Sequence, residues 1–319
     1  MSRILVIICI CLFSGCVELQ KKSSYTRSWI QEEQKIRVLC TTEYVAGLAL
    51  IVGGDEVSVL TLITGQNDPH SYHLVKGDDT KFRMAELIFC SGLMLEQGTV
   101  LERYLKRYSA CAIGDYIQHR TNGAIVMGTI YDPHIWNDMH LWAYGLFLVA
   151  DELSKIRPEK SGYFQKNAMD AFDRYQRLHK KFRDEMQRID KRRRYLVTTH
   201  DAFSYFCRAY VAPDDEIAND TWKLRCMAPE GFAPESQIST KDLLRVIDYI
   251  IEHDVHSVFA EVGVNHDSIQ KVVDICREKG CNVTLRKGFL YSDTMGPHST
   301  YEDVMKHNID VVATSFMES

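Results

Sequence analysis

One amphipathic pattern in the middle of the chain limits the possible folds more than any other feature. From position 158 to position 191, apolar side chains recur every three or four residues, and the positions between them are mostly charged or amide residues. The pattern predicts a single helix, which at about 1.5 Å per residue would be roughly 50 Å long. Pro158 suits its first turn, and the basic residues at positions 191–194 suit its C-terminal end. A helix of this length would join two units as a rigid strut.

Short apolar runs alternate with helical patterns on both sides of this helix. Each run is followed by a turn or a helical pattern, a βα rhythm that is typical of parallel sheets. We therefore expect an α/β protein with two lobes, residues 36–157 and residues 193–319, each with a parallel-rich sheet flanked by helices. Residues 158–192 would form the connecting helix. The apolar runs lie at positions 36–40, 57–63, 87–90, 195–199, 257–260 and 282–285.

The first 16 residues are typical of an export signal. Arg3 supplies a positive charge, residues 4–13 are apolar, and two small residues precede Cys16. The apolar run is too short to span a bilayer comfortably as a helix. Residues 12–16 resemble a bacterial lipobox, so we expect cleavage before Cys16, acylation of Cys16 and a polar tether over residues 17–35. The alternative is a short buried strand of a cytosolic protein.

Charge and cysteine content argue against several classes of function. A net charge of −5 disfavours non-specific attraction to nucleic acid, and a helix C-terminus already explains the basic run at positions 191–194. Seven of the ten cysteines remain after the signal and Cys16, and no Cys-x-x-Cys occurs, so a thiolate zinc site is not expected. In an exported protein Cys207 could pair with Cys226, or Cys276 with Cys281, if the geometry allows it.

Three histidines and one aspartate at predicted strand ends form a candidate metal-binding set. His70 and His134 each follow an Asp-Pro dipeptide, a turn that would aim the next side chain away from the strand. His200 lies where an apolar run meets a helical pattern, and Asp293 follows the last clear strand. Taken singly, each residue could be an ordinary turn or helix-end residue. Together they lie where open α/β sheets bind ligands, and they provide a complete ligand set for a divalent transition metal.

The donor types favour zinc over the other expected ions. Neutral imidazoles and one carboxylate suit Zn²⁺ better than the oxygen-preferring Mn²⁺, and Zn²⁺ binds more tightly than Mn²⁺ or Fe²⁺ in a given site. Manganese and iron remain alternatives, and a bidentate Asp293 would favour manganese. Glu261, at the end of the apolar run 257–260, is a candidate hydrogen-bond partner for a ligand imidazole. The alternative for Glu261 is a helix cap before Asn265.

The segments around these four residues resemble the ligand motifs of the solute-binding proteins of metal-ion ABC transporters, the TroA-like group of zinc and manganese binders. The resemblance extends from about Ile36 to the C-terminus. It implies that metal is held between two lobes, with two histidines from the first lobe and His200 and Asp293 from the second. The motifs are Asp-Pro-His-Ser-Tyr around His70, Asp-Pro-His-Ile-Trp-Asn around His134, Thr-His-Asp-Ala-Phe-Ser-Tyr-Phe around His200 and Tyr-Ser-Asp-Thr-Met-Gly around Asp293.

The same resemblance implies the partners and the location. We expect a monomeric carrier, not an enzyme, that is tethered outside the cytoplasm by its lipid anchor and serves a membrane permease and its ATPase subunit. Manganese members commonly carry Glu where this chain has His200. Zinc binders often carry a loop rich in His and acidic residues between the first two ligands, whereas residues 115–129 are short and hold only His119.

Two rival functions use the same residues. In a zinc hydrolase, the three histidines would leave an open coordination position and Asp293 would act as the base. The chain has no His-Glu-x-x-His motif and no evident separate base, which argues against this reading. In a surface adhesin the metal would be structural, and the chain would unfold without it, whereas a carrier stays folded when empty.

Overall fold

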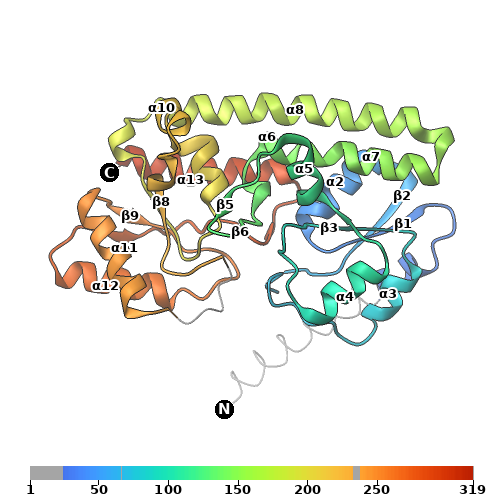
Figure 1. The fold of residues 1–319 in the computed structure, drawn as a ribbon, viewed down its shortest axis with the longest axis horizontal. Helices are drawn as coiled ribbons and strands as arrows, with labels where there is room; N and C mark the ends of the chain where they lie inside the picture. Colours follow the sequence, from blue (N-terminus) through green and yellow to red (C-terminus); the bar gives the residue numbers. More distant parts are fainter. Residues whose placement is uncertain (1–23, 66, 233–237, 319) are drawn as a thin grey trace, which may run out of the picture.

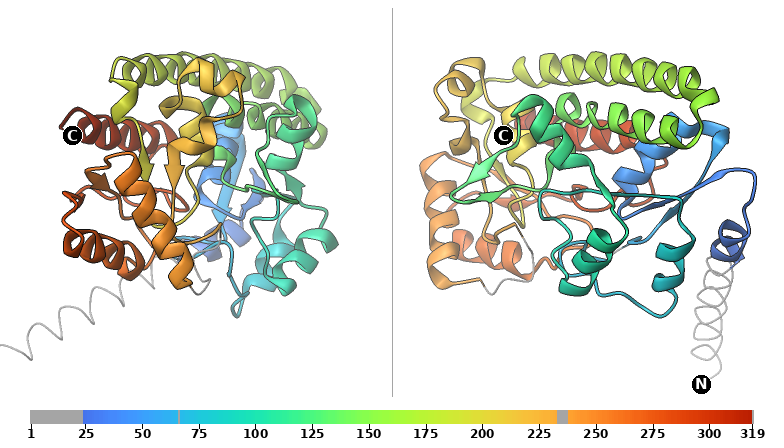
Figure 2. Two further views of the ribbon diagram at one scale, coloured as in Figure 1. Left: turned by 60° about the vertical axis from the view of Figure 1, so that its left-hand side comes forward. Right: turned by 45° about the vertical axis from the view of Figure 1, so that its right-hand side comes forward.

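The structure, a computed structural model, describes residues 24–65, 67–232 and 238–318. It has two α/β lobes, and helix α8 lies along one side of both (Figure 1). The two further views of the ribbon show the same arrangement (Figure 2). The expected α/β fold class is therefore confirmed. The expected signal peptide, residues 1–16 with Cys16, lies outside the described residues.

The first lobe contains a four-stranded parallel sheet in the order β2-β1-β3-β4. Three of its strands coincide with the apolar runs that start at positions 36, 57 and 87. The strands are β1 (Ile36–Cys40), β2 (Val57–Thr61), β3 (Leu87–Cys90) and β4 (Cys111–Ala112), and a hairpin follows from β5 (Val126–Met127) and β6 (Ile130–Tyr131). The helices are α2 (Glu43–Gly53), α3 (Asp78–Met84), α4 (Thr99–Arg107), α5 (Ile113–Thr121), α6 (Met139–Trp142) and α7 (Gly145–Ile156).

The second lobe has shorter strands than the apolar runs predict. Its two parallel pairs, β7 with β8 and β9 with β10, are joined by a bond from Phe259 N to Val197 O of 2.9 Å. The strands are β7 (Leu196–Val197), β8 (Cys226–Met227), β9 (Ser257–Val258) and β10 (Thr284–Leu285). The helices are α9 (Ser204–Phe206), α10 (Asp214–Ala218), α11 (Thr240–Glu252), α12 (Asp267–Glu278) and α13 (Tyr301–Glu318).

The connecting helix α8 (Ser161–Gln187) has 27 residues, which corresponds to about 40 Å. The expected segment was longer because its ends form separate 3-10 turns, Pro158–Lys160 and Lys191–Arg193. The helix packs on α2 and α7 of the first lobe and on α13 of the second, so it contacts both lobes directly. Its buried face is formed by Phe164, Ala168, Ala171, Tyr175, Phe182 and Met186.

The expected tether over residues 17–35 is wrong for its second half. Residues 24–30 are helical and pack on the edge strand β2. The buried Trp29 donates its indole N–H to Ser58 O at 2.8 Å, and Tyr25 donates its hydroxyl to Val59 O at 2.7 Å. The segment is mostly polar, so its composition did not indicate that its two aromatic side chains pack on the sheet. Within the described ranges, no helix is long and apolar enough to cross a membrane.

All seven cysteines of the described residues carry free thiols. They include the four residues that the sequence suggested as two possible pairs. Cys207 and Cys276 are fully buried in two separate apolar clusters of the second lobe, the first of which extends across α8, as small apolar side chains are.

Candidate metal centre

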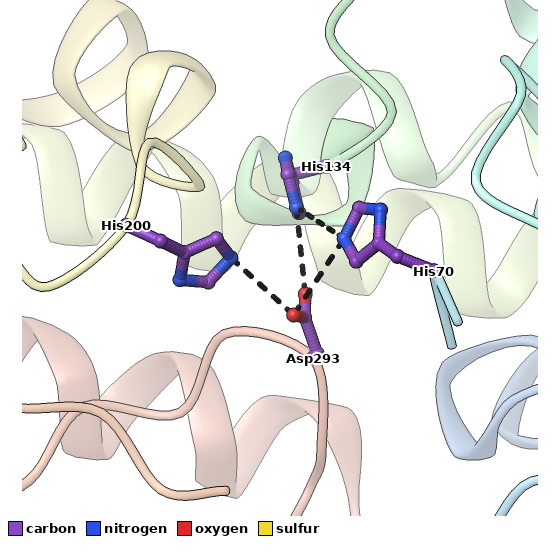
Figure 3. A group of neighbouring side chains, drawn as sticks. All are labelled: His70, His134, His200 and Asp293. Carbon is purple, nitrogen blue, oxygen red and sulfur yellow. Dashed lines mark hydrogen bonds and ion pairs between the residues drawn. The ribbon is translucent and has the colours of Figure 1, made fainter. Parts of the chain in front are cut away.

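The structure brings His70, His134, His200 and Asp293 together between the lobes (Figure 3). Each residue offers one ligand atom, and these four atoms lie within 4.8 Å of one another. The three imidazoles are buried, and the carboxylate is 10% exposed. Two of these side chains come from the first lobe and two from the second, so the site depends on how the lobes are positioned relative to each other.

The two Asp-Pro-His segments fold in the same way. Asp68 Oδ1 accepts a hydrogen bond from the backbone N–H of His70 at 2.8 Å, and Asp132 Oδ1 does the same for His134 at 2.9 Å. Such turns, in which an Asp side chain binds the backbone two residues on, point the following side chain in a defined direction. The repeated motif in the sequence thus corresponds to a repeated local structure.

Asp132 has a further role that the sequence reasoning missed. Its Oδ1 lies 2.8 Å from His134 Nδ1 as well, and both side chains are fully buried. A carboxylate at Nδ1 favours the tautomer with the proton on that nitrogen and leaves Nε2 free to bind metal. The sequence signal for this role is the acidic residue two positions before the histidine, which the Asp-Pro turn by itself also explains.

Glu261 forms an ion pair with the ring of His200 and hydrogen bonds with the backbone beside it. Its Oε2 lies 2.7 Å from His200 Nδ1, and its Oε1 accepts hydrogen bonds from the backbone N–H groups of Thr199 and His200, both at 2.9 Å. The carboxylate therefore holds both the ring and the backbone of this ligand. The alternative role as a helix cap does not occur, because α12 begins at Asp267 with His266 at its N-cap position.

The distances around Asp293 suit a metal ion surrounded by ligands. Its Oδ2 lies 3.3 Å from His200 Nε2 and 3.7 Å from His70 Nε2, and its Oδ1 lies 3.5 Å from His134 Nε2. The Nε2 atoms of His70 and His134 are 3.2 Å apart. In a tetrahedral site with bonds near 2.1 Å, neighbouring ligand atoms are about 3.4 Å apart.

The charges of the site residues favour a bound cation. Burial alone would lower the pKa of His200, but the carboxylates of Glu261 and Asp293 outweigh it and hold this pKa well above its usual range. Burial lowers the pKa of His70 to about 3, against the opposing effect of Asp293. Burial would raise the pKa of Asp293, yet the imidazoles, His200 foremost, hold it below its usual range. The carboxylate is thus ionised, and His70 is neutral, at neutral pH.

Aromatic rings surround part of the site. The rings of Trp136 and Phe232 lie 5.4 Å and 6.2 Å from that of His134, measured between centroids. Trp142 packs behind Trp136, and Tyr205 donates its hydroxyl to Asp132 O at 2.9 Å. These residues limit access of water to the imidazoles, which strengthens electrostatic interactions inside the site.

Comparisons with known proteins find relatives whose names describe metal binding. Residues 38–315 match the family described as ZnuA, the zinc-uptake complex component A, periplasmic. The metal-binding protein YtgA of Chlamydia muridarum is 35% identical over 305 residues, which covers 95% of this chain and 92% of that protein. The manganese-binding lipoprotein MntA of Bacillus subtilis is 32% identical, covering 88% and 89%. The crystal structure of Fe(III)-bound YtgA from Chlamydia trachomatis superposes with a TM-score of 0.82 at 34% identity, covering 88% and 97%.

Proposed function

The chain belongs to the ZnuA family of metal-binding solute-binding proteins, and on that premise we propose that it captures one divalent transition metal ion with His70, His134, His200 and Asp293 and delivers it to a membrane permease. The observation that carries this proposal is the convergence of three imidazoles and one carboxylate from two lobes. Members of this family are substrate-binding proteins of ABC importers rather than enzymes, which removes the hydrolase reading.

We further propose zinc as the ion that this site binds most tightly. Three imidazole nitrogens and one carboxylate match the borderline softness of Zn²⁺, and four donors complete its tetrahedral coordination. The carboxylates behind His134 and His200 raise the basicity of these ligands. The four distances described above, 3.2–3.7 Å, are close to the spacing in such a site when either oxygen of Asp293 is counted, and with one atom per residue all distances stay within 4.8 Å.

Manganese and iron form the second candidate, because both oxygens of Asp293 face the imidazoles. A bidentate carboxylate would raise the coordination number to five, and harder ions that accept more oxygen donors would gain from it. The names of two relatives point the same way, since one is manganese-binding and the other was crystallised with Fe(III).

Release requires the ligands of one lobe to separate from those of the other. The lobes share the helix α8, which contacts both, so we propose a small rotation or a movement of the loop around Asp293 rather than a wide hinge motion. The remaining parts of the proposal come from the sequence and the family. They are lipidation at Cys16, a location outside the cytoplasm, a monomeric state and an ABC permease with its ATPase as partners.

Metal analysis and competitive titration test the proposal. The purified protein should bind one ion, and Zn²⁺ should displace Mn²⁺. His200→Ala should bind Zn²⁺ more than about 100-fold more weakly, which exceeds the usual effect of removing a residue that only hydrogen-bonds to a ligand. His119→Ala changes an exposed histidine outside the site and should bind like the wild type. Full affinity in His200→Ala would contradict the proposed site.

A further inference from the structure

The loop that carries Asp293 is held by both lobes. On its own lobe, Asn308 of α13 binds the backbone of Tyr291, accepting from its N–H at 3.0 Å and donating to its carbonyl at 2.8 Å. After Tyr291, the carbonyls of Ser292 and Thr294 and the backbone N–H of Met295 bind side chains of the first lobe. Asp293 therefore sits on a segment that belongs to the second lobe by sequence and is also held by the first.

Two aromatic residues of the first lobe bind the backbone on either side of Asp293. Trp136 donates its indole N–H to Ser292 O at 2.7 Å, and Tyr44 donates its hydroxyl to Thr294 O at 3.2 Å. The two rings are stacked, with centroids 5.2 Å apart and planes 18° from parallel. They form a stiff support against which the loop rests.

Glu43 adds a charged contact to the same loop. Its Oε2 accepts hydrogen bonds from Met295 N at 2.9 Å and from Thr294 Oγ1 at 3.2 Å. Its Oε1 lies 3.5 Å from Gly65 N, in the segment that leads to His70. One carboxylate thus contacts both segments that carry ligands from opposite lobes.

The position of Glu43 is set by the start of helix α2. Thr42 is the N-cap residue and accepts a bond from Val45 N, so Glu43 occupies the first helical position. An acidic residue there stabilises a helix through the macrodipole, which would be a sufficient structural reason for its presence. Stabilisation of α2 would not require Glu43 to bind the other lobe.

We infer that Glu43 is a latch between the lobes, a positioning residue that holds the Asp293 loop closed and sets the rate at which metal leaves. The inference rests on the proposed function and deepens it. Any opening that separates Asp293 from the first-lobe imidazoles His70 and His134 also separates Met295 from Glu43. The bond is assisted by the carboxylate charge, which makes it stronger than a bond between neutral groups.

Release kinetics test the latch. Zn²⁺ bound to Glu43→Ala should dissociate to a chelator about tenfold faster than from the wild type, the effect of losing a charge-assisted hydrogen bond. Glu86→Ala is the matched control, because Glu86 accepts a bond from Arg37 N at 3.1 Å within the first lobe. It should release Zn²⁺ at the wild-type rate. Equal rates for Glu43→Ala and the wild type would overturn the inference.

A double-mutant cycle separates the latch from an effect on the helix start. Thr294→Val removes one donor to Glu43, together with the acceptor of Gly296 N, so it should accelerate release in the wild type and less in the Glu43→Ala background. Purely additive effects would refute a contribution of the Thr294 contact to the latch and leave the bond from Met295 N, which hydrogen exchange tests.

Hydrogen exchange gives a readout that needs no metal. In the metal-free protein, the Met295 amide should exchange faster in Glu43→Ala than in the wild type, because its acceptor is gone. If the wild type bound no Zn²⁺, the proposed function would fail, and this exchange comparison would still decide on the latch. Unchanged exchange at Met295 would count against it.

Discussion

At the scale of single residues, carboxylates behind the imidazoles do as much to define the site as the ligands themselves. Asp132 and Glu261 each face an Nδ1 atom and each bind the backbone of the histidine that they orient. Each carboxylate thereby faces Nδ1 and leaves Nε2 as the nitrogen that points into the site. The orientation of these two imidazoles is therefore set before any metal arrives.

Changing Glu261 to Gln should weaken metal binding by about 10-fold to 100-fold. The amide oxygen can still accept from Thr199 N and His200 N, but the amide nitrogen would then donate to His200 Nδ1. The ring proton would move to Nε2, where it blocks the metal. Competition titration against a chelator of known affinity measures the change.

Glu96→Gln is the control for that measurement. Glu96 is a buried carboxylate of the first lobe that also accepts from two backbone amides, Ser91 N at 2.8 Å and Gly92 N at 3.2 Å. It orients no imidazole, so its variant should retain the affinity of the wild type. A Glu261→Gln variant that binds as tightly as Glu96→Gln would refute the role assigned to Glu261.

Metal affinity should fall as the pH falls. The raised pKa of His200 means that its ring is protonated in the metal-free protein near neutral pH, and the metal must displace this proton. Below that pKa, the affinity should drop about tenfold per pH unit. Calorimetry in buffers of different ionisation enthalpy would detect the released proton. An affinity that stays constant from about pH 8 to pH 5 would contradict the expectation.

The same shift has the opposite sign for the stability of the empty protein. A folded-state pKa above the unfolded value of about 6.5 means that protonated His200 stabilises the metal-free fold below that pH. This contribution is lost as the pH rises through the folded-state pKa. Through His200, acidification therefore disfavours the metal complex and stabilises the empty fold, whereas the lowered pKa of His70 acts against that stability below about pH 6.5.

At the scale of elements, α8 transmits the position of one lobe to the other. Its buried face packs on α2 and α7 in the first lobe and on α13 in the second, and α2 and α13 also carry Glu43 and Asn308, which hold the Asp293 loop. Helices α2 and α13 thus contact both α8 and the loop that carries Asp293. Movement of α13 relative to α2 would act on the loop directly.

Truncation of the α8 core should destabilise the whole protein. Phe164 is fully buried, and Phe164→Ala should lower the free energy of unfolding by about 3–5 kcal/mol, because it removes buried apolar surface and leaves a cavity. Met169 lies on the same helix but is 50% exposed, so Met169→Ala should change stability by less than about 0.5 kcal/mol. Urea unfolding compares the two variants. Equal losses would mean that the buried face does not carry the stability.

At the scale of the molecule, the site lies where the two lobes meet, and no single lobe contains it. Each lobe has its own apolar core, and one cluster extends across α8. We therefore expect the fold not to depend on the metal. This property distinguishes a carrier, which must remain folded when empty, from a protein with a structural ion.

Removal of metal should leave the fold intact. After chelation, the far-UV circular dichroism spectrum should be unchanged, and Zn²⁺ should raise the melting temperature, with a stabilisation of about 2.7 kcal/mol at a free concentration 100 times Kd. Loss of helical signal on chelation would instead support the structural-metal reading of a surface adhesin. The chelated protein refilled with Zn²⁺ serves as the control for damage by the chelator.

The amino-acid sequence by itself determined the α/β class, the long helix and the identity of the four converging residues. Periodicity reports which side chains are buried in a helix or strand, and the repeated Asp-Pro-His turn is a local structure that needs no distant partner. The apolar runs of the second lobe predicted longer strands than the two-residue strands that form there, because apolar composition does not reveal where hydrogen-bonded pairing stops.

Only the tertiary structure decided how these parts meet. Trp29 packs on β2, Asp132 and Glu261 face imidazoles, and Glu43 binds a loop some 250 residues further along the chain. These contacts join segments that are far apart in the sequence, and a single sequence gives no indication that such segments meet. Their geometry depends on the relative placement of two packed lobes. The long helix could be predicted from its pattern of apolar residues, whereas the contacts between the two lobes that it joins could not.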